Sequence, residues 1–153
     1  MSDGRTEYCD GCDSRCCRYF TVPLGAPEDW DDFDAMRWYL LHEGVSIYVD
    51  AEGDWLLNVS SPCRALDENG LCKVYDSRPH ICRDHTEAVC EKGETRYDFR
   101  EHFFTADELE AYARRFMARR EASRRRRSLA AKRAWNRRRL AGQLAGDGER
   151  NGP

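Results

Sequence analysis

Eight cysteines in two groups constrain the fold of this chain more than any other feature. The first group reads C-x2-C-x3-C-C (Cys9, Cys12, Cys16 and Cys17), and the second reads C-x8-C-x9-C-x7-C (Cys63, Cys72, Cys82 and Cys90). Only 41% of the 153 residues are hydrophobic, which leaves a lean apolar core. Lean cores are often supported by a bound metal or by disulfides. We therefore expect the two groups to meet in space around a metal.

The cysteines are expected to ligate a metal rather than to form disulfides. Residues 1–20 contain no apolar run typical of a signal peptide, and no stretch is long enough to span a bilayer. These features predict a cytoplasmic protein, in which thiols stay reduced and grouped cysteines more often bind metal. The adjacent Cys16 and Cys17 also cannot easily bridge each other. Disulfides and plain buried thiols are the alternatives.

Thiolates are soft ligands, so a site built from them favours Zn²⁺ or an iron–sulfur cluster such as 4Fe–4S. The eight cysteines could form two four-thiolate sites, or one site with accessory cysteines. Their spacing differs from the ferredoxin run and does not select the metal. His80 and His85 lie beside Cys82 in the sequence and could replace a thiolate, but we favour supporting or surface roles for both.

Hydrophobic periodicity and turn residues predict an α+β fold. The predicted elements are a strand at 18–24, a helix at 28–43, a hairpin of strands at 45–49 and 54–59, and a strand at 95–104. Acidic residues after Pro27 favour the helix start, and Gly44 favours its end. We expect the hairpin to pack on the helix, with Trp30, Trp38 and Trp55 in the core.

Turns are expected to arrange the second cysteine group. The D-E-N-G sequence at 67–70 favours a tight reversal that brings Cys63 and Cys72 together. Pro79 suits the start of a short helical turn that carries Cys82. The predicted architecture is a small metal-centred cysteine-cluster domain with a β-hairpin and short helices, followed by a long basic C-terminal helix or tail.

The chain is divided electrostatically. Residues 1–110 carry 25 acidic residues and 11 Lys or Arg, whereas residues 111–153 carry 3 acidic residues and 14 Lys or Arg. A capping box at Thr105–Glu108 marks the start of a helix. The predicted organisation is a cysteine-cluster domain at 1–104, a basic helix at 105–145 and a disordered tail at 146–153.

The basic segment permits several interpretations. Arginine-only runs suit phosphate backbones, and Trp135 between them could stack on a base or insert at a membrane interface. Nucleic acid is therefore a candidate partner for residues 119–139. A solvated extension, or one folded on the acidic domain, is the simpler alternative.

The cysteine pattern resembles a known family. The string C-x8-C-x2-Y-x2-R-P-x2-C-R, preceded by C-x2-C-x3-C-C, is similar to the YkgJ family of zinc- or iron-chelating cysteine-cluster domains. The string comprises Cys63, Cys72, Tyr75, Arg78, Pro79, Cys82 and Arg83. The resemblance covers about residues 9–90 and implies a metal-binding domain. Related clusters occur in flagellin lysine N-methylases, where an iron–sulfur cluster is implicated in methyl transfer, so the resemblance slightly favours iron–sulfur over zinc.

Four residues of this string are expected to support the cysteines: Tyr75, Arg78, Pro79 and Arg83. The two arginines would offset the negative charge of the thiolates, or form ordinary ion pairs with Asp76 and Asp84. Tyr75 would pack in the core or donate a hydrogen bond to a sulfur, and packing is the preferred interpretation.

The sequence leaves the question of catalysis open. It contains no phosphate-binding glycine loop and no serine motif typical of hydrolases. Any catalysis would therefore depend on the metal. The leading hypothesis is a metal-binding protein; the alternatives are an iron–sulfur enzyme of methyl transfer or redox chemistry, and a nucleic-acid-binding module with a structural metal.

Overall fold

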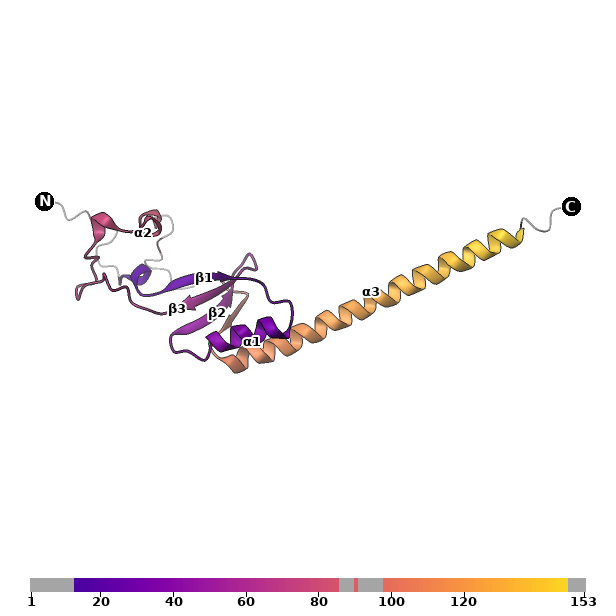
Figure 1. Ribbon diagram of the computed structural model, residues 1–153, viewed down its shortest axis with the longest axis horizontal. Coiled ribbons are helices and arrows are strands. Elements are labelled where there is room, and N and C mark those ends of the chain that lie inside the picture. The colour runs from indigo at the N-terminus through magenta and orange to yellow at the C-terminus, as the bar shows by residue number, and fades with distance from the viewer. Residues whose placement is uncertain (1–12, 86–89, 91–97, 149–153) are drawn as a thin grey trace. The chain divides into compact units, whose positions relative to one another are not determined.

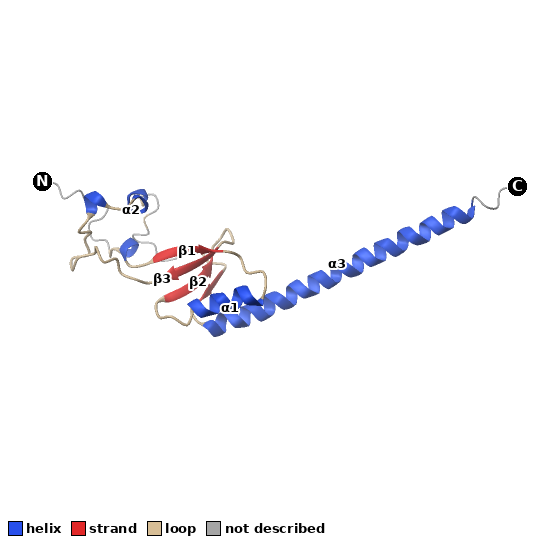
Figure 2. Cartoon of the chain, in the orientation of Figure 1, coloured by secondary structure: helices blue, strands red, loops and turns tan. Residues whose placement is uncertain are grey.

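The computed structural model describes residues 13–85, 90 and 98–148 (Figure 1). The chain divides into two compact units, Met1–Leu109 and Glu110–Pro153. The first unit contains a four-stranded antiparallel sheet, helix α1 and short helical turns, which confirms the predicted α+β class (Figure 2). Within the described residues, no helix is long and apolar enough to cross a membrane.

The sheet is built around the predicted hairpin. Strands β2 (Val45–Val49) and β3 (Trp55–Val59) pair antiparallel at its centre. The Asp50 carboxylate fixes their turn, because its Oδ1 accepts hydrogen bonds from the backbone N–H groups of Gly53 and Asp54, both at 2.8 Å. Gly53 has a φ of 102°, a conformation that favours glycine. The hairpin prediction is confirmed.

Two edge strands complete the sheet in the order β1-β3-β2-β4. Strand β1 (Phe20–Leu24) pairs with β3, and it begins two residues later than predicted because the preceding turn takes Cys17 and Arg18. Strand β4 (Glu101–Phe103) pairs with β2. It is shorter than the predicted strand at 95–104, of which residues 95–97 lie outside the described residues.

Helix α1 (Trp30–Tyr39) packs against the sheet, as predicted. It is shorter than the predicted helix at 28–43, because Asp29 caps its start and Leu40 is its C-cap. The chain then continues in tighter turns, with the Leu41 and His42 N–H groups bonded three residues back, before it reaches Gly44 at a φ of 72°. The Phe33 ring, which is fully buried, meets Trp55 edge-on with ring centroids 6.1 Å apart. Apolar burial of this kind is the main stabilising term of the fold.

The tryptophan prediction is correct for one residue of three. Trp55 is buried in the sheet, whereas Trp30 and Trp38 are 47% and 58% exposed. Periodicity identified α1 but not which side of it would face the sheet. Phe33, Met36 and Leu40 take the buried positions, and this leaves both tryptophans on the outer side.

Helix α3 (Ala106–Gly148) begins at the predicted capping box. The Glu108 Oε2 accepts from the Thr105 N–H at 3.0 Å, and the Thr105 hydroxyl accepts from the Glu108 N–H at 3.3 Å. Its 43 residues correspond to about 64 Å at 1.5 Å per residue. The helix extends three residues past the predicted end at 145, and residues 149–153 lie outside the described residues.

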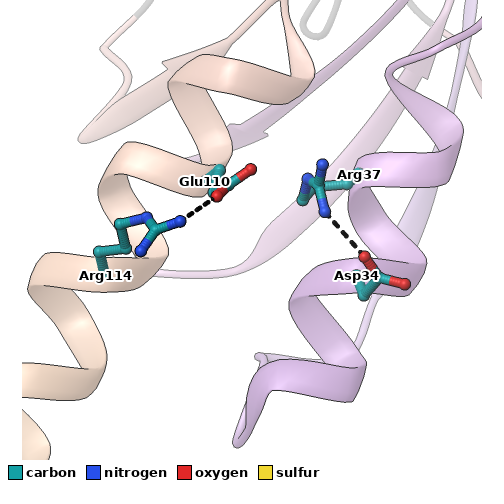
Figure 3. Close-up of polar contacts among 4 residues, drawn as sticks. All are labelled: Asp34, Arg37, Glu110 and Arg114. Carbon is teal, nitrogen blue, oxygen red and sulfur yellow. Dashed lines mark hydrogen bonds and ion pairs between the residues drawn. The ribbon is translucent and has the colours of Figure 1, made fainter.

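Each of the longer helices carries an ion pair within itself (Figure 3). In α1, Arg37 Nη1 lies 2.9 Å from Asp34 Oδ1, three residues earlier. In α3, Arg114 pairs with Glu110, four residues earlier. Exposed pairs at these spacings stabilise a helix by about 0.2–0.5 kcal/mol each, so they adjust the stability of the fold rather than determine it.

Candidate metal centre

A tight turn presents the last two cysteines of the first group. The 3-10 helix η2 (Arg15–Cys17) follows Ser14, whose φ of 60° lies in the left-handed region. The Cys17 N–H donates to the Ser14 carbonyl at 2.9 Å, and this bond closes the turn. Cys16 is exposed and Cys17 is half-buried. Cys9 and Cys12 lie outside the described residues.

A loop closed by its own hydrogen bonds brings the first two cysteines of the second group, Cys63 and Cys72, towards each other. Asp67 Oδ1 accepts hydrogen bonds from the N–H groups of Asn69 (2.9 Å) and Leu71 (2.7 Å). Leu66 forms an antiparallel bridge with Cys72, while the Leu66 N–H donates to the Cys63 carbonyl at 3.0 Å. The predicted reversal at 67–70 is therefore present, and Gly70, at a φ of 77°, carries its positive dihedral.

The two cysteine-bearing segments are joined directly. The Cys63 N–H donates to the Cys17 carbonyl at 2.7 Å, across 46 positions of the chain. A second bond runs from the Ser14 hydroxyl to the Gly70 carbonyl at 2.6 Å. Segments 14–17 and 63–70 therefore lie side by side.

Cys17 lies at the centre of this meeting. Burial raises the pKa of its thiol, and the negative charges of Cys63, Cys72 and Cys82 raise it further, while a hydrogen bond with Cys16 lowers it. Cysteines of both groups therefore lie near the Cys17 thiol. A thiol whose pKa is raised in this way ionises readily at neutral pH only if a cation lies beside it. A bound metal would supply that cation.

The described thiols lie near one another, but their sulfurs are not close enough together to coordinate one metal ion. Among the described residues, no group of three or more His, Cys, Asp or Glu side chains is arranged to hold a metal ion. Coulombic effects extend over several ångströms, whereas a zinc–sulfur bond is about 2.3 Å long. No described cysteine forms a disulfide. The donor set is therefore suitable for a thiophilic metal, and its sulfurs would have to close around the ion.

The remaining cysteines of the second group lie in and beyond the short helix α2 (His80–Asp84). The exposed Cys82 lies in this helix, and Cys90 is half-buried. Pro79 precedes α2 at its N-cap, as the sequence predicted. The side chains of His80 and Asp84 pair at 2.7 Å on the surface, and this contact gives His80 a partner other than a metal.

The motif residues before Cys82 contact one another. The Arg78 guanidinium stacks over the Tyr75 ring at 3.6 Å, and its Nε donates to the Tyr75 carbonyl at 2.9 Å. Arg83 donates to the Arg78 carbonyl. These contacts join the 3-10 helix η3 (Tyr75–Ser77) to α2, so the four residues of the string act on the shape of the segment that carries Cys82.

Sequence reasoning missed Ser14. Its neighbours gave it no distinguishing pattern, yet it is a buried polar residue, 7% exposed, and its hydroxyl helps to join the cysteine segments. Its partner Gly70 did carry a signal, because the Asn-Gly pair identified the turn.

One comparison with known proteins gives a match. A family model named CxxCxxCC, whose description reads "Putative zinc- or iron-chelating domain", matches residues 8–115 and so includes every cysteine of the chain. Neither a curated protein nor a solved structure matches this chain.

Proposed function

The chain belongs to the CxxCxxCC family of zinc- or iron-chelating domains, and from this we propose that its two cysteine groups jointly bind either Zn²⁺ or an iron–sulfur cluster. The candidate ligands are the eight thiolates: Cys9, Cys12, Cys16, Cys17, Cys63, Cys72, Cys82 and Cys90. Four of them suffice for one tetrahedral zinc site or one cubane cluster.

The observation that carries the proposal is the hydrogen bond between the two cysteine groups, in which the Cys63 N–H donates to the Cys17 carbonyl at 2.7 Å. Burial raises the pKa of the Cys17 thiol and the nearby Cys63, Cys72 and Cys82 raise it further, in agreement with cysteines of both groups lying near one another. The backbone bond between Cys17 and Cys63 holds the two segments together independently of any metal. A preformed approach of this kind lowers the conformational cost of closing the thiolates around an ion.

The protein residues would hold the metal and balance its charge. Four thiolates around Zn²⁺ leave a net charge of about −2. Arg78 and Arg83, on the segment that carries Cys82, are candidates to offset it. A closed thiolate zinc site is structural, whereas an iron–sulfur cluster would add redox capacity. A reducing compartment such as the cytoplasm would keep these thiols available as ligands.

Metal analysis with an absorption spectrum, after anaerobic purification, tests the proposal. We expect bound zinc in a colourless protein, or iron and sulfide in a brown protein whose colour bleaches on reduction. Replacing Cys63 by Ser should lower the bound metal sharply, while the exposed neighbour Ser61→Ala should leave it unchanged. Wild-type protein that binds neither zinc nor iron, or a Cys63→Ser variant with full metal content, would contradict the proposal.

We propose nucleic acid as a second ligand, bound by the arginine-rich part of α3. Residues 114–139 carry 13 Lys or Arg and a single acidic residue, Glu121. At 1.5 Å per residue this is about one net positive charge per 3 Å, close to the 3.4 Å phosphate spacing along one nucleic-acid strand. Arginine also binds phosphate oxygens in a bidentate manner.

Exposure and an aromatic side chain favour this second ligand. All residues of 118–139 except Ala134 are exposed around every side of the helix. Trp135 is 59% exposed, and the Arg139 guanidinium lies 5.4 Å from the centre of its ring. An exposed aromatic ring beside cations is the usual means of stacking on an unpaired base.

Binding of labelled single-stranded RNA and DNA to the full chain, at several salt concentrations, tests this proposal. A six-fold Arg→Gln variant, at 124, 126, 127, 133, 137 and 138, keeps good helix-forming residues and should lower the salt slope by about 4. Trp135→Ala should weaken single-strand binding more than duplex binding. Equal affinity of the wild-type chain for polyglutamate or for anionic vesicles would contradict the nucleic-acid assignment.

A further inference from the structure

This chain has one residue more than the family name between its second and third cysteines. The name CxxCxxCC places two residues there, whereas this chain has three, Asp13, Ser14 and Arg15. Ser14 is the middle one, and it is the only described residue other than glycine with a positive φ, at 60°. Such a backbone is unfavourable for a residue with a side chain, so other contacts must hold it in place.

The contact that holds Ser14 reaches the other cysteine segment. Its side chain does not cap η2; instead the hydroxyl donates to the Gly70 carbonyl at 2.6 Å, 56 residues away. Its carbonyl accepts from the Cys17 N–H. Ser14 therefore joins the turn that carries Cys16 and Cys17 to the loop between Cys63 and Cys72.

Gly70 is shaped to receive this hydroxyl. A Cβ atom on Gly70 would lie 2.8 Å from the Ser14 Oγ, and Gly70 has a φ of 77°. The Gly70 N–H donates to the Asp67 carbonyl at 3.1 Å, and Asp67 fixes the rest of the loop. A rigid loop thus offers one carbonyl at close range to one buried hydroxyl.

We infer that Ser14 is a positioning residue of the metal centre, which sets the approach of Cys16 and Cys17 to Cys63 and Cys72 before metal binds. The inference rests on the proposed metal-binding function. Groups that orient ligands without touching the metal typically change metal affinity about ten- to hundred-fold when they are removed. Of the two hydrogen bonds described between segments 14–17 and 63–70, loss of the Ser14 hydroxyl leaves the Cys17–Cys63 bond, about which the segments could turn.

Ser14→Gly separates positioning from backbone strain. Glycine removes the hydroxyl but adopts a positive φ readily, so a role limited to the backbone conformation of Ser14 predicts unchanged zinc affinity. The positioning role predicts zinc affinity lower by about ten- to hundred-fold, measured by competition with a chromophoric chelator under anaerobic, reducing conditions. The exposed Ser61→Gly is the control and should stay within about two-fold of wild type.

A double-mutant cycle with Gly70 tests the same contact from the other side. Gly70→Ala should also weaken zinc binding, whereas Gly25→Ala should not, because nothing lies within 4 Å of the Cβ added at Gly25. Ser14→Gly removes the hydroxyl oxygen that the methyl group of the Gly70→Ala variant would meet, so the double variant should lose less than the product of the two separate losses. The intensity of the thiolate-to-Co²⁺ absorption band shows whether fewer thiolates reach the metal.

The outcomes distinguish this inference from the proposed function. Wild-type protein without a thiolate-to-metal absorption band would overturn both. A wild-type protein with that band, together with a Ser14→Gly variant that binds zinc within about two-fold of it, would overturn the role of Ser14 alone. Multiplicative losses in the double variant would also overturn it, because they would show that Ser14 and Gly70 act independently.

Discussion

Burial gives His102 a reduced affinity for protons. Its Nε2 lies 3.2 Å from the Ser46 hydroxyl, and its ring centroid lies 4.0 Å from that of Phe104 and 4.8 Å from that of Phe99. Removal from water lowers the pKa of His102, and the Glu108 carboxylate opposes the shift. His102 is therefore a neutral member of the sheet at physiological pH.

Protonation of His102 should destabilise the fold in mild acid. Its folded pKa lies below the ordinary value of about 6.5, so the unfolded chain takes up the proton first as the pH falls. The stability that His102 contributes is present above about pH 6.5 and is lost as the pH falls from there towards the folded pKa. Urea unfolding of wild-type and His102→Gln protein measures it, because the stability difference between them should change in this window. A constant difference from about pH 7.5 to 5.5 would contradict the prediction.

The site residues differ in how far sequence reasoning could reach them. The cysteines and the motif residues Tyr75, Arg78, Pro79 and Arg83 could be proposed from the sequence because their residue types and spacing form the family pattern. Ser14 was invisible, since its role arises from a contact with Gly70 that no local pattern encodes. Which of the eight thiolates ligate a metal stays a prediction.

At the scale of elements, local signals predicted local structure well. The hairpin and the capping box at Thr105–Glu108 depend on turn and cap residues within a few positions of one another, and both are present. The pairing of β1 with β3 and of β4 with β2 could not be predicted from local sequence patterns, because partners such as Val49 and Glu101 lie far apart along the chain. The outward position of Trp38 was missed because it depends on which side of α1 packs against the sheet, and this contact is also between segments distant in the sequence.

In the long basic helix α3, local helix propensity and charge repulsion oppose each other. Abundant helix-forming residues predicted α3, but like charges such as Arg115 and Arg119, four positions apart, oppose it. Pairs such as Arg125 with Glu121, at 2.6 Å, offset only part of this repulsion. A polyanion bound along the helix would relieve it, and this links the stability of α3 to the second ligand proposed above.

At the scale of the whole molecule, the first unit combines two means of stabilisation. Its described buried apolar side chains lie in α1, in or beside the sheet and at the start of α3, among them Phe33, Ile47 and Leu109. The described cysteine-bearing segments, 13–18, 60–85 and 90, contribute none, and Ser14 is their one buried residue. The sheet thus has an apolar core, whereas the cysteine part relies on a few hydrogen bonds and on the metal proposed above.

Removal of the metal should therefore melt the cysteine part before the sheet. Binding free energies of structural zinc are of order 10 kcal/mol, similar to the whole stability of a small domain, so the segments that depend on the metal should lose nearly all of their protection. Hydrogen exchange with and without a strong chelator, under anaerobic and reducing conditions, measures this segment by segment. We expect faster exchange at 14–17 and 63–82 and retained protection in β2 and β3, since their apolar packing does not involve the cysteines. Equal loss of protection in the sheet, at the same chelator concentration, would instead mean that the metal supports the first unit as one cooperative body.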